Sequence, residues 1–192
     1  MNNGGRSKVS VLALLLCCAH MLVAQAPFDL DEGFRTELNK KFVNSMVELD
    51  NGDLLLSGIL RWDGDLFDRG YVRVTPSGQR IDDYPDFAPG GGKITPWSDR
   101  YYIGNANIVR RIFSDGSLDP DFISMNLGRY FLSLQGGDYH VYPDGRLLMS
   151  GAHMLRDSIR GFEGLYSLIW FSNEGYLDTT RTHRLCNGVI YA

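Results

Sequence analysis

The sequence predicts an all-β protein made of antiparallel, four-stranded repeats, and three observations carry this prediction. The 192 residues include 22 glycines, and the apolar stretches are short runs between clusters of turn residues. Three segments share one pattern at a nearly constant spacing, and a second hairpin with its own glycine turn follows each of them. Regular spacing of this kind is typical of repeat proteins.

Residues 1–24 are predicted to be a secretory signal peptide that is removed from the folded domain. Arg6 and Lys8 precede an apolar run that ends in small residues, and the chain then turns polar. The run is shorter than the roughly 20 apolar residues that span a bilayer. We expect cleavage after Ala24, with cleavage after Ala26 as the alternative.

The mature chain has a different composition from the whole sequence. Cleavage removes Cys17 and Cys18, so Cys186 has no partner for an internal disulfide. It also removes two basic residues, which takes the formal charge from −4 to −6. No run of Lys or Arg remains to meet phosphates, and this excludes nucleic-acid binding. We expect a secreted or cell-surface protein with no membrane span after signal removal and no disulfide framework.

The first hairpin of each predicted repeat contains an apolar strand with a glycine. The three strands are "DLLLSGIL", "RYYIGNAN" and "RLLMSGAH", and their glycines are 46 and 47 residues apart. A turn and another short strand precede each one, at "SMVEL", "KITPW" and "YHVY". The pattern therefore aligns Gly58, Gly104 and Gly151 as equivalent positions.

The second hairpin of each repeat has a turn centred on Gly78, Gly116 or Gly175. Tight turns of this kind need a residue that accepts a positive φ at no steric cost. We therefore expect Gly116, and Gly145 in the preceding turn type, at positive φ. Only the connection between the two hairpins varies in length, as insertions on one face of a repeat do.

Four short antiparallel strands in about 46 residues match one blade of a β-propeller. Residues 25–192 would then form about three blades of a partial propeller, which suggests a fragment of a longer protein or an association of copies. The N-terminal "LDEGF" repeats the pattern of "LDPDF", so the mature chain would begin with the last strand of a unit. The predicted units lie near residues 43–87, 93–122 and 139–181, with the start of a fourth at 188–192.

These motifs resemble the delta-60 repeat family, a β-propeller-type repeat of secreted bacterial proteins. The matching segments are "YPDGRLLMSG" and "VRRIFSDGSLDPDF", with looser matches at "LDNGDLLLSG" and "YVRVTPSGQRIDDYPDF". The resemblance covers residues 28–192 and implies a fold and export, but no particular chemistry. Two positions depart from the family pattern, because two extra residues precede Phe87 and Arg181 stands where Phe is expected.

Two acidic stretches are candidates for cation binding. In "LDPDF", Asp119 and Asp121 offer two carboxylates, whereas a calcium site needs about six oxygens, so we interpret them as turn caps at the end of a strand. The loop "WDGDLFDRG" has more carboxylates but lacks the acidic twelfth-position ligand of an EF-hand, which favours a solvated turn. Its three candidate ligands are Asp63, Asp65 and Asp68.

Other residue groups fit structural roles better than a site. Aromatic residues at strand positions are typical of a core, with a sugar-binding platform as the alternative. The histidines lack a paired-ligand spacing, and "PGGGK" lacks the Ser or Thr and the helix of a phosphate loop, which favours a linker. The aromatic set is Trp62, Trp97, Tyr101, Tyr102 and Trp170, and the histidines are His140, His153 and His183.

The leading hypothesis is an exported, non-catalytic β-propeller repeat protein that serves as a binding or surface scaffold. The alternatives are a carbohydrate-active enzyme and a purely structural segment of a large surface protein, because fold alone does not decide function. We predict no cofactor, no metal and no catalytic residue, and a carbohydrate or protein at the cell surface as the partner. Open blades leave exposed strand edges, so we also expect residues 25–192 to be marginally stable and to self-associate.

Overall fold

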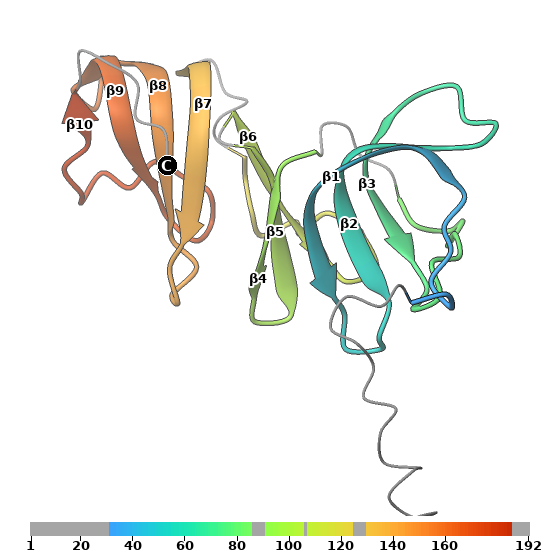
Figure 1. Ribbon diagram of the computed structural model, residues 1–192. Coiled ribbons are helices and arrows are strands. Elements are labelled where there is room, and N and C mark those ends of the chain that lie inside the picture. Colours follow the sequence, from blue (N-terminus) through green and yellow to red (C-terminus); the bar gives the residue numbers. More distant parts are fainter. Residues whose placement is uncertain (1–30, 86–90, 106, 125–129, 186–192) are drawn as a thin grey trace, which may run out of the picture. The chain divides into compact units, whose positions relative to one another are not determined.

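The computed structural model describes residues 31–85, 91–105, 107–124 and 130–185. The chain divides into two compact units, Met1–Gly33 and Phe34–Ala192. In the first unit, the N–H of Gly33 donates to the Asp31 carboxylate over 2.9 Å. The second unit holds every labelled strand in Figure 1. Outside the described residues lie the predicted signal peptide, Phe87, Cys186 and the predicted start of a fourth repeat at 188–192.

The described residues form ten strands and no helix, which confirms the all-β prediction. This part of the chain accordingly offers no helix able to cross a membrane. All strand pairs are antiparallel, in a first sheet of order β1-β2-β3, a second of order β4-β5-β6 and a third of order β10-β9-β8-β7 (Figure 1). The strands are β1 (Leu38–Glu48), β2 (Leu54–Trp62), β3 (Arg69–Val74), β4 (Lys93–Trp97), β5 (Arg100–Asn105), β6 (Ile108–Phe113), β7 (Phe131–Val141), β8 (Leu147–Asp157), β9 (Phe162–Phe171) and β10 (Arg184–Leu185).

The first two sheets each contribute side chains to two apolar cores, because neighbouring residues of a strand point to opposite faces. Leu55 of β2 packs in one cluster with Ile103 and Ile112 of the second sheet. Its neighbour Leu56 packs on the opposite face, in a cluster of the first sheet. Tyr102 of β5 is buried in the cluster of the third sheet, whereas Ile103 faces the first. Consecutive sheets are therefore joined face to face by apolar cores.

Five hairpin turns in the described residues share one hydrogen-bond pattern. After β9, the Gly175 N–H donates to the Ser172 carbonyl (3.0 Å), and the Ser172 N–H donates to the Tyr176 carbonyl (2.7 Å). This is a type I turn followed by a residue in the left-handed region. The predicted positive φ of Gly116 and Gly145 is confirmed, at 83° and 81°. The five glycines are Gly52, Gly78, Gly116, Gly145 and Gly175.

The fourth strand of the predicted repeat is reduced to a single bridge in the first and second sheets, so the prediction of four strands is wrong there. A polar side chain turns the chain after the bridge in the second repeat, whereas the equivalent residue of the first repeat is Ile81. In the second repeat, the Asp119 carboxylate accepts the N–H of Asp121 over 2.9 Å, a local turn that competes with strand pairing. The three equivalent bridges join Val74 to Arg80, Ile112 to Leu118 and Phe171 to Leu177.

Gly104 is not structurally equivalent to Gly58 and Gly151, with which the sequence pattern aligned it, but lies one residue earlier in its repeat. It pairs with Val109 at the position that Ser57 and Ser150 occupy in the other sheets. The cause is the preceding turn, because only residues 98–99 separate β4 from β5, while the equivalent turns have the three-residue glycine pattern. Equivalent positions are therefore defined by strand pairing.

Tyr84 takes the place in the first repeat that the sequence pattern gave to Phe87. Tyr84 and Phe122 each stand four residues after the bridge that ends their sheet. Tyr84 makes an edge-to-face contact with Tyr71 at 5.8 Å, and Phe122 makes one with Tyr102 at 5.4 Å. Both rings fill the core between their own sheet and the next.

The third repeat exchanges the two members of an arginine–aromatic pair. In the second repeat, the guanidinium of Arg111 lies 5.0 Å from the ring centre of Phe122. In the third, Trp170 stands at the Arg111 position and Arg181 at the Phe122 position, again 5.0 Å apart. The substitution of Arg181 for Phe is thus accompanied by a second one that restores the cation–π contact.

Tyr84→Phe is expected to leave stability unchanged or to raise it by up to about 1 kcal/mol. The Tyr84 hydroxyl is buried without a hydrogen-bond partner in the described structure, and the equivalent Phe122 has no hydroxyl. Urea unfolding measures the change. The matched control is Tyr102→Phe, which removes a hydrogen bond of 2.7 Å to the Gly145 carbonyl and should cost about 1–2 kcal/mol. Equal losses in the two variants would contradict this account.

Candidate functional site

The three carboxylates of the acidic loop between β2 and β3 all have neighbouring side chains as partners. The hydrogen bond from Arg69 is the largest of several effects that hold the pKa of Asp65 below its usual range. Each predicted ligand has its own partner, and no group of three His, Cys, Asp or Glu residues in the described part of the chain could hold a metal ion. The pairs are Asp63 with Asn39 (2.7 Å), Asp65 with Arg69 (2.7 Å) and Arg80 (3.5 Å), and Asp68 with Arg61 (2.5 Å).

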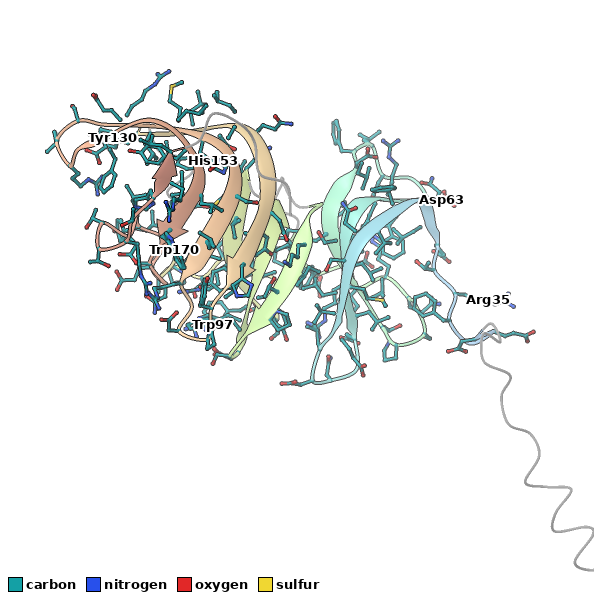
Figure 2. The ribbon with its side chains drawn as sticks, turned by 60° about the vertical axis from the view of Figure 1, so that its left-hand side comes forward. Arg35, Asp63, Trp97, Tyr130, His153 and Trp170 are labelled. Carbon is teal, nitrogen blue, oxygen red and sulfur yellow. The ribbon has the colours of Figure 1, made fainter. Side chains whose placement is uncertain are left out.

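The five candidate aromatic residues are distributed over all three sheets and form no common platform. Trp62 is buried in the first sheet and Tyr102 in the core between the second and third sheets. Figure 2 shows Trp97 and Trp170 on different sheets, and Asp63 beside the first sheet. The Trp97 indole N–H donates to the Pro143 carbonyl over 2.9 Å. Trp62 and Tyr102 thus confirm the interpretation as packing groups, whereas Trp97 and Trp170 are only partly buried.

His153 and His183 are buried and hydrogen bonded to the main chain. Nε2 of His153 donates to the Ser150 carbonyl over 2.9 Å. Nδ1 of His183 accepts the N–H of Trp170 (3.2 Å), so its Nε2 carries the proton donated to the Asp178 carbonyl (3.0 Å). Burial lowers the pKa of both imidazoles below the usual value. Both histidines therefore act as neutral structural groups.

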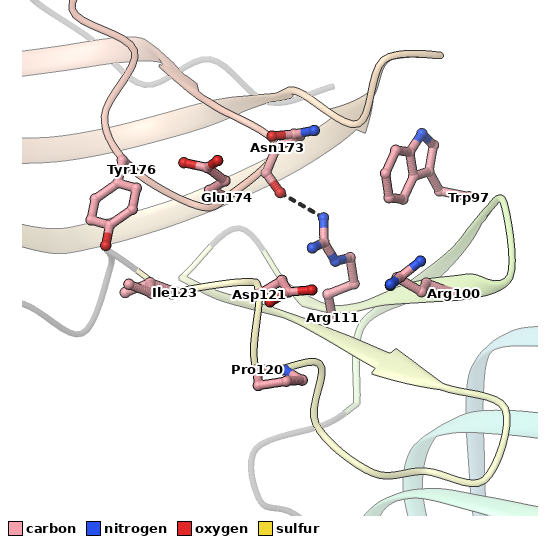
Figure 3. A pocket seen from close by; sticks show the side chains of 9 residues that line it. All are labelled: Trp97, Arg100, Arg111, Pro120, Asp121, Ile123, Asn173, Glu174 and Tyr176. Atoms are coloured by element: carbon pink, nitrogen blue, oxygen red, sulfur yellow. Dashed lines mark hydrogen bonds between the residues drawn. The ribbon is translucent and has the colours of Figure 1, made fainter.

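A pocket of about 520 Å³ opens where the second and third sheets meet, and we call it the seam pocket (Figure 3). One side comes from the second sheet and the segment after it, and the other from the hairpin turn that follows β9. No Ser, Cys or His lines it, so it lacks the parts of a Ser–His or Cys–His nucleophile. Its lining residues are Trp97, Arg100, Arg111, Pro120, Asp121, Ile123, Asn173, Glu174 and Tyr176.

Arg111 of β6 holds the two sides of the seam pocket together. Its side chain is only 5% exposed, and its Nε donates to the Asp119 carboxylate over 2.6 Å. Its Nη1 donates to the Tyr102 hydroxyl (3.0 Å) and to the main-chain carbonyl of Asn173 (2.6 Å). The guanidinium also lies 5.1 Å from the ring centre of Trp97. One side chain thus joins the second sheet to the third.

Asp119 remains charged beneath this pocket although it is fully buried. Burial alone would raise its pKa, but the N–H of Asp121 and the guanidinium groups of Arg111 and Arg100 outweigh that effect and hold the pKa below its usual range. Arg100 approaches the carboxylate to 2.7 Å. The other carboxylate oxygen of Asp119 accepts the Asp121 N–H and caps the turn, which confirms the turn-cap interpretation of Asp119.

The mouth of the seam pocket carries polar groups that the fold does not use. Among the described residues, the carboxylates of Asp121 and Glu174 form no ion pair, and the side-chain amide of Asn173 forms no hydrogen bond. The ring of Tyr176 is 44% exposed. Sequence reasoning considered Asp121 as a cation ligand and Trp97 as part of a sugar platform, but it did not place them in one site. These groups can accept and donate hydrogen bonds to a polar ligand.

Comparisons with known proteins identify no family for this chain. No protein-family model matches it, and no curated protein does. Among solved structures, it is similar to a protein of unknown function from Bacteroides caccae, at 12% identity and a TM-score of 0.27, over 70% of this chain. The match spans 65% of the length of that protein. Likeness at this level carries no argument about function, and the resemblance to delta-60 repeats stays a prediction.

Proposed function

We propose that the chain is an exported, non-catalytic repeat protein of the β-propeller type that binds a carbohydrate in the seam pocket. The observation that carries this proposal is the pair of carboxylates, Asp121 and Glu174, which stand without ion-pair partners in the described structure beside a buried cationic group. By contrast, the carboxylates in the acidic loop of the first sheet already have side-chain partners. Polar groups that line a pocket and have no partner within the protein are typical of ligand sites.

A carbohydrate fits the chemistry of the seam pocket because its hydroxyl groups both donate and accept hydrogen bonds. The carboxylates of Asp121 and Glu174 accept, and the guanidinium of Arg100 donates. The ring of Tyr176 offers an apolar face for the C–H side of a sugar. Arg111 fixes both walls in advance, so little ordering is required on binding.

The propeller architecture is supported by contacts that recur from one repeat to the next. Arg73 of β3 donates to the Ser114 carbonyl over 3.2 Å, as Arg111 does to that of Asn173. Each acceptor stands two residues before the glycine of the next second-hairpin turn. A constant contact between successive units implies a constant rotation, which is the basis of radial and solenoid repeats.

Carbohydrate binding can be tested by titration calorimetry of the mature chain against a panel of soluble oligosaccharides. We expect Glu174→Gln and Tyr176→Ala to abolish binding, since both residues lie at the mouth of the seam pocket. Phe67→Ala, on the exposed loop of the first sheet, should bind as the parent does. Binding that survives both pocket substitutions would contradict the site. An absence of binding across the panel would contradict the ligand class, and release of sugar products would contradict a non-catalytic role.

A further inference from the structure

A short segment with a glycine lies at the start of β4 and within β7, which are the first strands of the second and third repeats. The sequences are "GGKI" (91–94) and "GGDY" (136–139), and a third segment of the same kind, "NGVI" (187–190), follows β10. The last residue of each segment is apolar. We call these three segments the lead-in segments.

The first lead-in segment lies on the first sheet. The N–H of Gly91 donates to the Ser57 hydroxyl, and the N–H of Ile94 donates to that of Ser45, both over 3.1 Å. The Ile94 side chain is buried in one cluster with Leu55 and Tyr71. An apolar residue of the second repeat thus covers the exposed face of the sheet before it.

The second lead-in segment repeats this arrangement on the second sheet. Tyr139 is buried with Tyr102 and Val109, which occupy the positions of Leu55 and Tyr71 in strand pairing. Its hydroxyl oxygen lies 2.8 Å from the main-chain carbonyl oxygen of Lys93 and 3.1 Å from that of Tyr102, and its single proton is shared between them. Close approach is required here too, because a Cβ on Gly136 would lie 2.6 Å from the side chain of Asn107.

On the third sheet, a pocket lies over the face that corresponds to the one covered in the first two sheets. Leu148 and Leu168 occupy the positions of Leu55 and Tyr71, and Ser150 occupies that of Ser57. Both leucines are only half-buried, whereas Leu55 is fully buried. A pocket of about 300 Å³ lies over them, lined by Lys93, Asp138, Tyr139, His140, Leu148, Ser150 and Leu168.

We propose that the third lead-in segment docks in this pocket, with Ile190 covering Leu148 and Leu168 as Ile94 covers Leu55 and Tyr71. The chain can reach it, because five residues from Leu185 to Ile190 extend up to about 17 Å. Three strand spacings of about 4.8 Å separate β10 from the inner strand β7. The apolar lining matches an isoleucine side chain, and the docking is independent of any ligand in the seam pocket.

Hydrogen-exchange mass spectrometry of the full mature chain tests this docking. Amides of residues 189–191 should exchange slowly, at a rate that does not depend on protein concentration. Ile190→Asp should abolish the protection, since it places a charge between two leucines. The matched control is Tyr191→Asp, because the next residue of a strand points to the opposite face and should leave the protection in place.

Three results would overturn the proposal. The first is fast exchange of residues 189–191 in the parent chain. The second is an equal loss of protection in the Ile190→Asp and Tyr191→Asp variants, which would show that the two side chains do not differ in burial. The third is protection that appears only at high protein concentration, because a second copy of the chain would then cover the face of Leu148 and Leu168.

Discussion

Gly175→Ala is expected to lower the free energy of unfolding by about 3 kcal/mol, as the sum of backbone strain and overpacking. Gly175 has a φ of 84°, where a residue with a Cβ is strained. Its Cβ would also lie 1.8 Å from the carbonyl oxygen of Ile123, and main-chain atoms cannot yield as a flexible side chain can. Relief requires the hairpin turn and the segment after the second sheet to separate.

The control for this variant is Gly161→Ala in the loop between β8 and β9. Gly161 has a φ of 78°, but nothing lies within 4 Å of the Cβ position. This control therefore measures the backbone strain alone, which is about 1 kcal/mol. Urea unfolding of both variants isolates the cost of the close approach as the difference between them. Equal losses would show that the turn and Ile123 do not touch in solution.

The contact at Gly175 also explains why the repeat was visible in the sequence. The N–H of Ile123 donates to the Glu174 carbonyl over 2.8 Å, and that of Arg35 donates to the Ser77 carbonyl over 2.9 Å. Gly78 and Gly175 are thus each fixed twice, by their own φ and by the main chain of a preceding segment. Such positions tolerate little else, so the turns could be predicted from residue type and spacing.

Strand ends and equivalent positions were harder to predict, because distant contacts decide them. Gly104 matched Gly58 in the sequence pattern, yet a turn shorter by one residue moves it to the Ser57 position. Tyr84 fills the place that the pattern gave to Phe87, because packing against Tyr71 selects a ring at that distance from the bridge. The local sequence pattern does not show that Gly104 pairs with Val109 or that Tyr84 packs against Tyr71.

The candidate sites also differ in how far the sequence could predict them. Neutralisation of the acidic loop was predictable, since Arg61 and Arg69 flank it in the sequence and pair with Asp68 and Asp65. The seam pocket was not, because it joins the end of the second repeat to a turn of the third, about 50 residues later. The sequence offered Asp121, Trp97 and Arg111 as separate signals, and nothing in their spacing indicated that they line one pocket.

Arg111→Met is expected to destabilise the chain by about 3 kcal/mol, which is typical when one partner of a buried ion pair is removed. The variant leaves the Asp119 carboxylate, which is fully buried, with Arg100 as its remaining cation. It also removes the donor to the Asn173 carbonyl, so the second and third sheets lose a hydrogen bond of 2.6 Å. Methionine retains much of the arginine's apolar stem, so the loss reports the guanidinium.

Two control comparisons distinguish the loss of this buried ion pair from the general effect of removing one positive charge on the free energy of unfolding. Arg61→Met removes an exposed partner of Asp68 and should cost less than about 1 kcal/mol. In Arg111→Met/Asp119→Asn, the amide oxygen still accepts the Asp121 N–H but no buried charge is left, so the double variant should lose less than the two single losses added together. Denaturant titrations of the parent chain, Arg111→Met, Asp119→Asn and the double variant give the coupling. If Arg111→Met costs no more than Arg61→Met, Arg100 alone neutralises Asp119, and the two sheets are held together by their apolar core and not by Arg111.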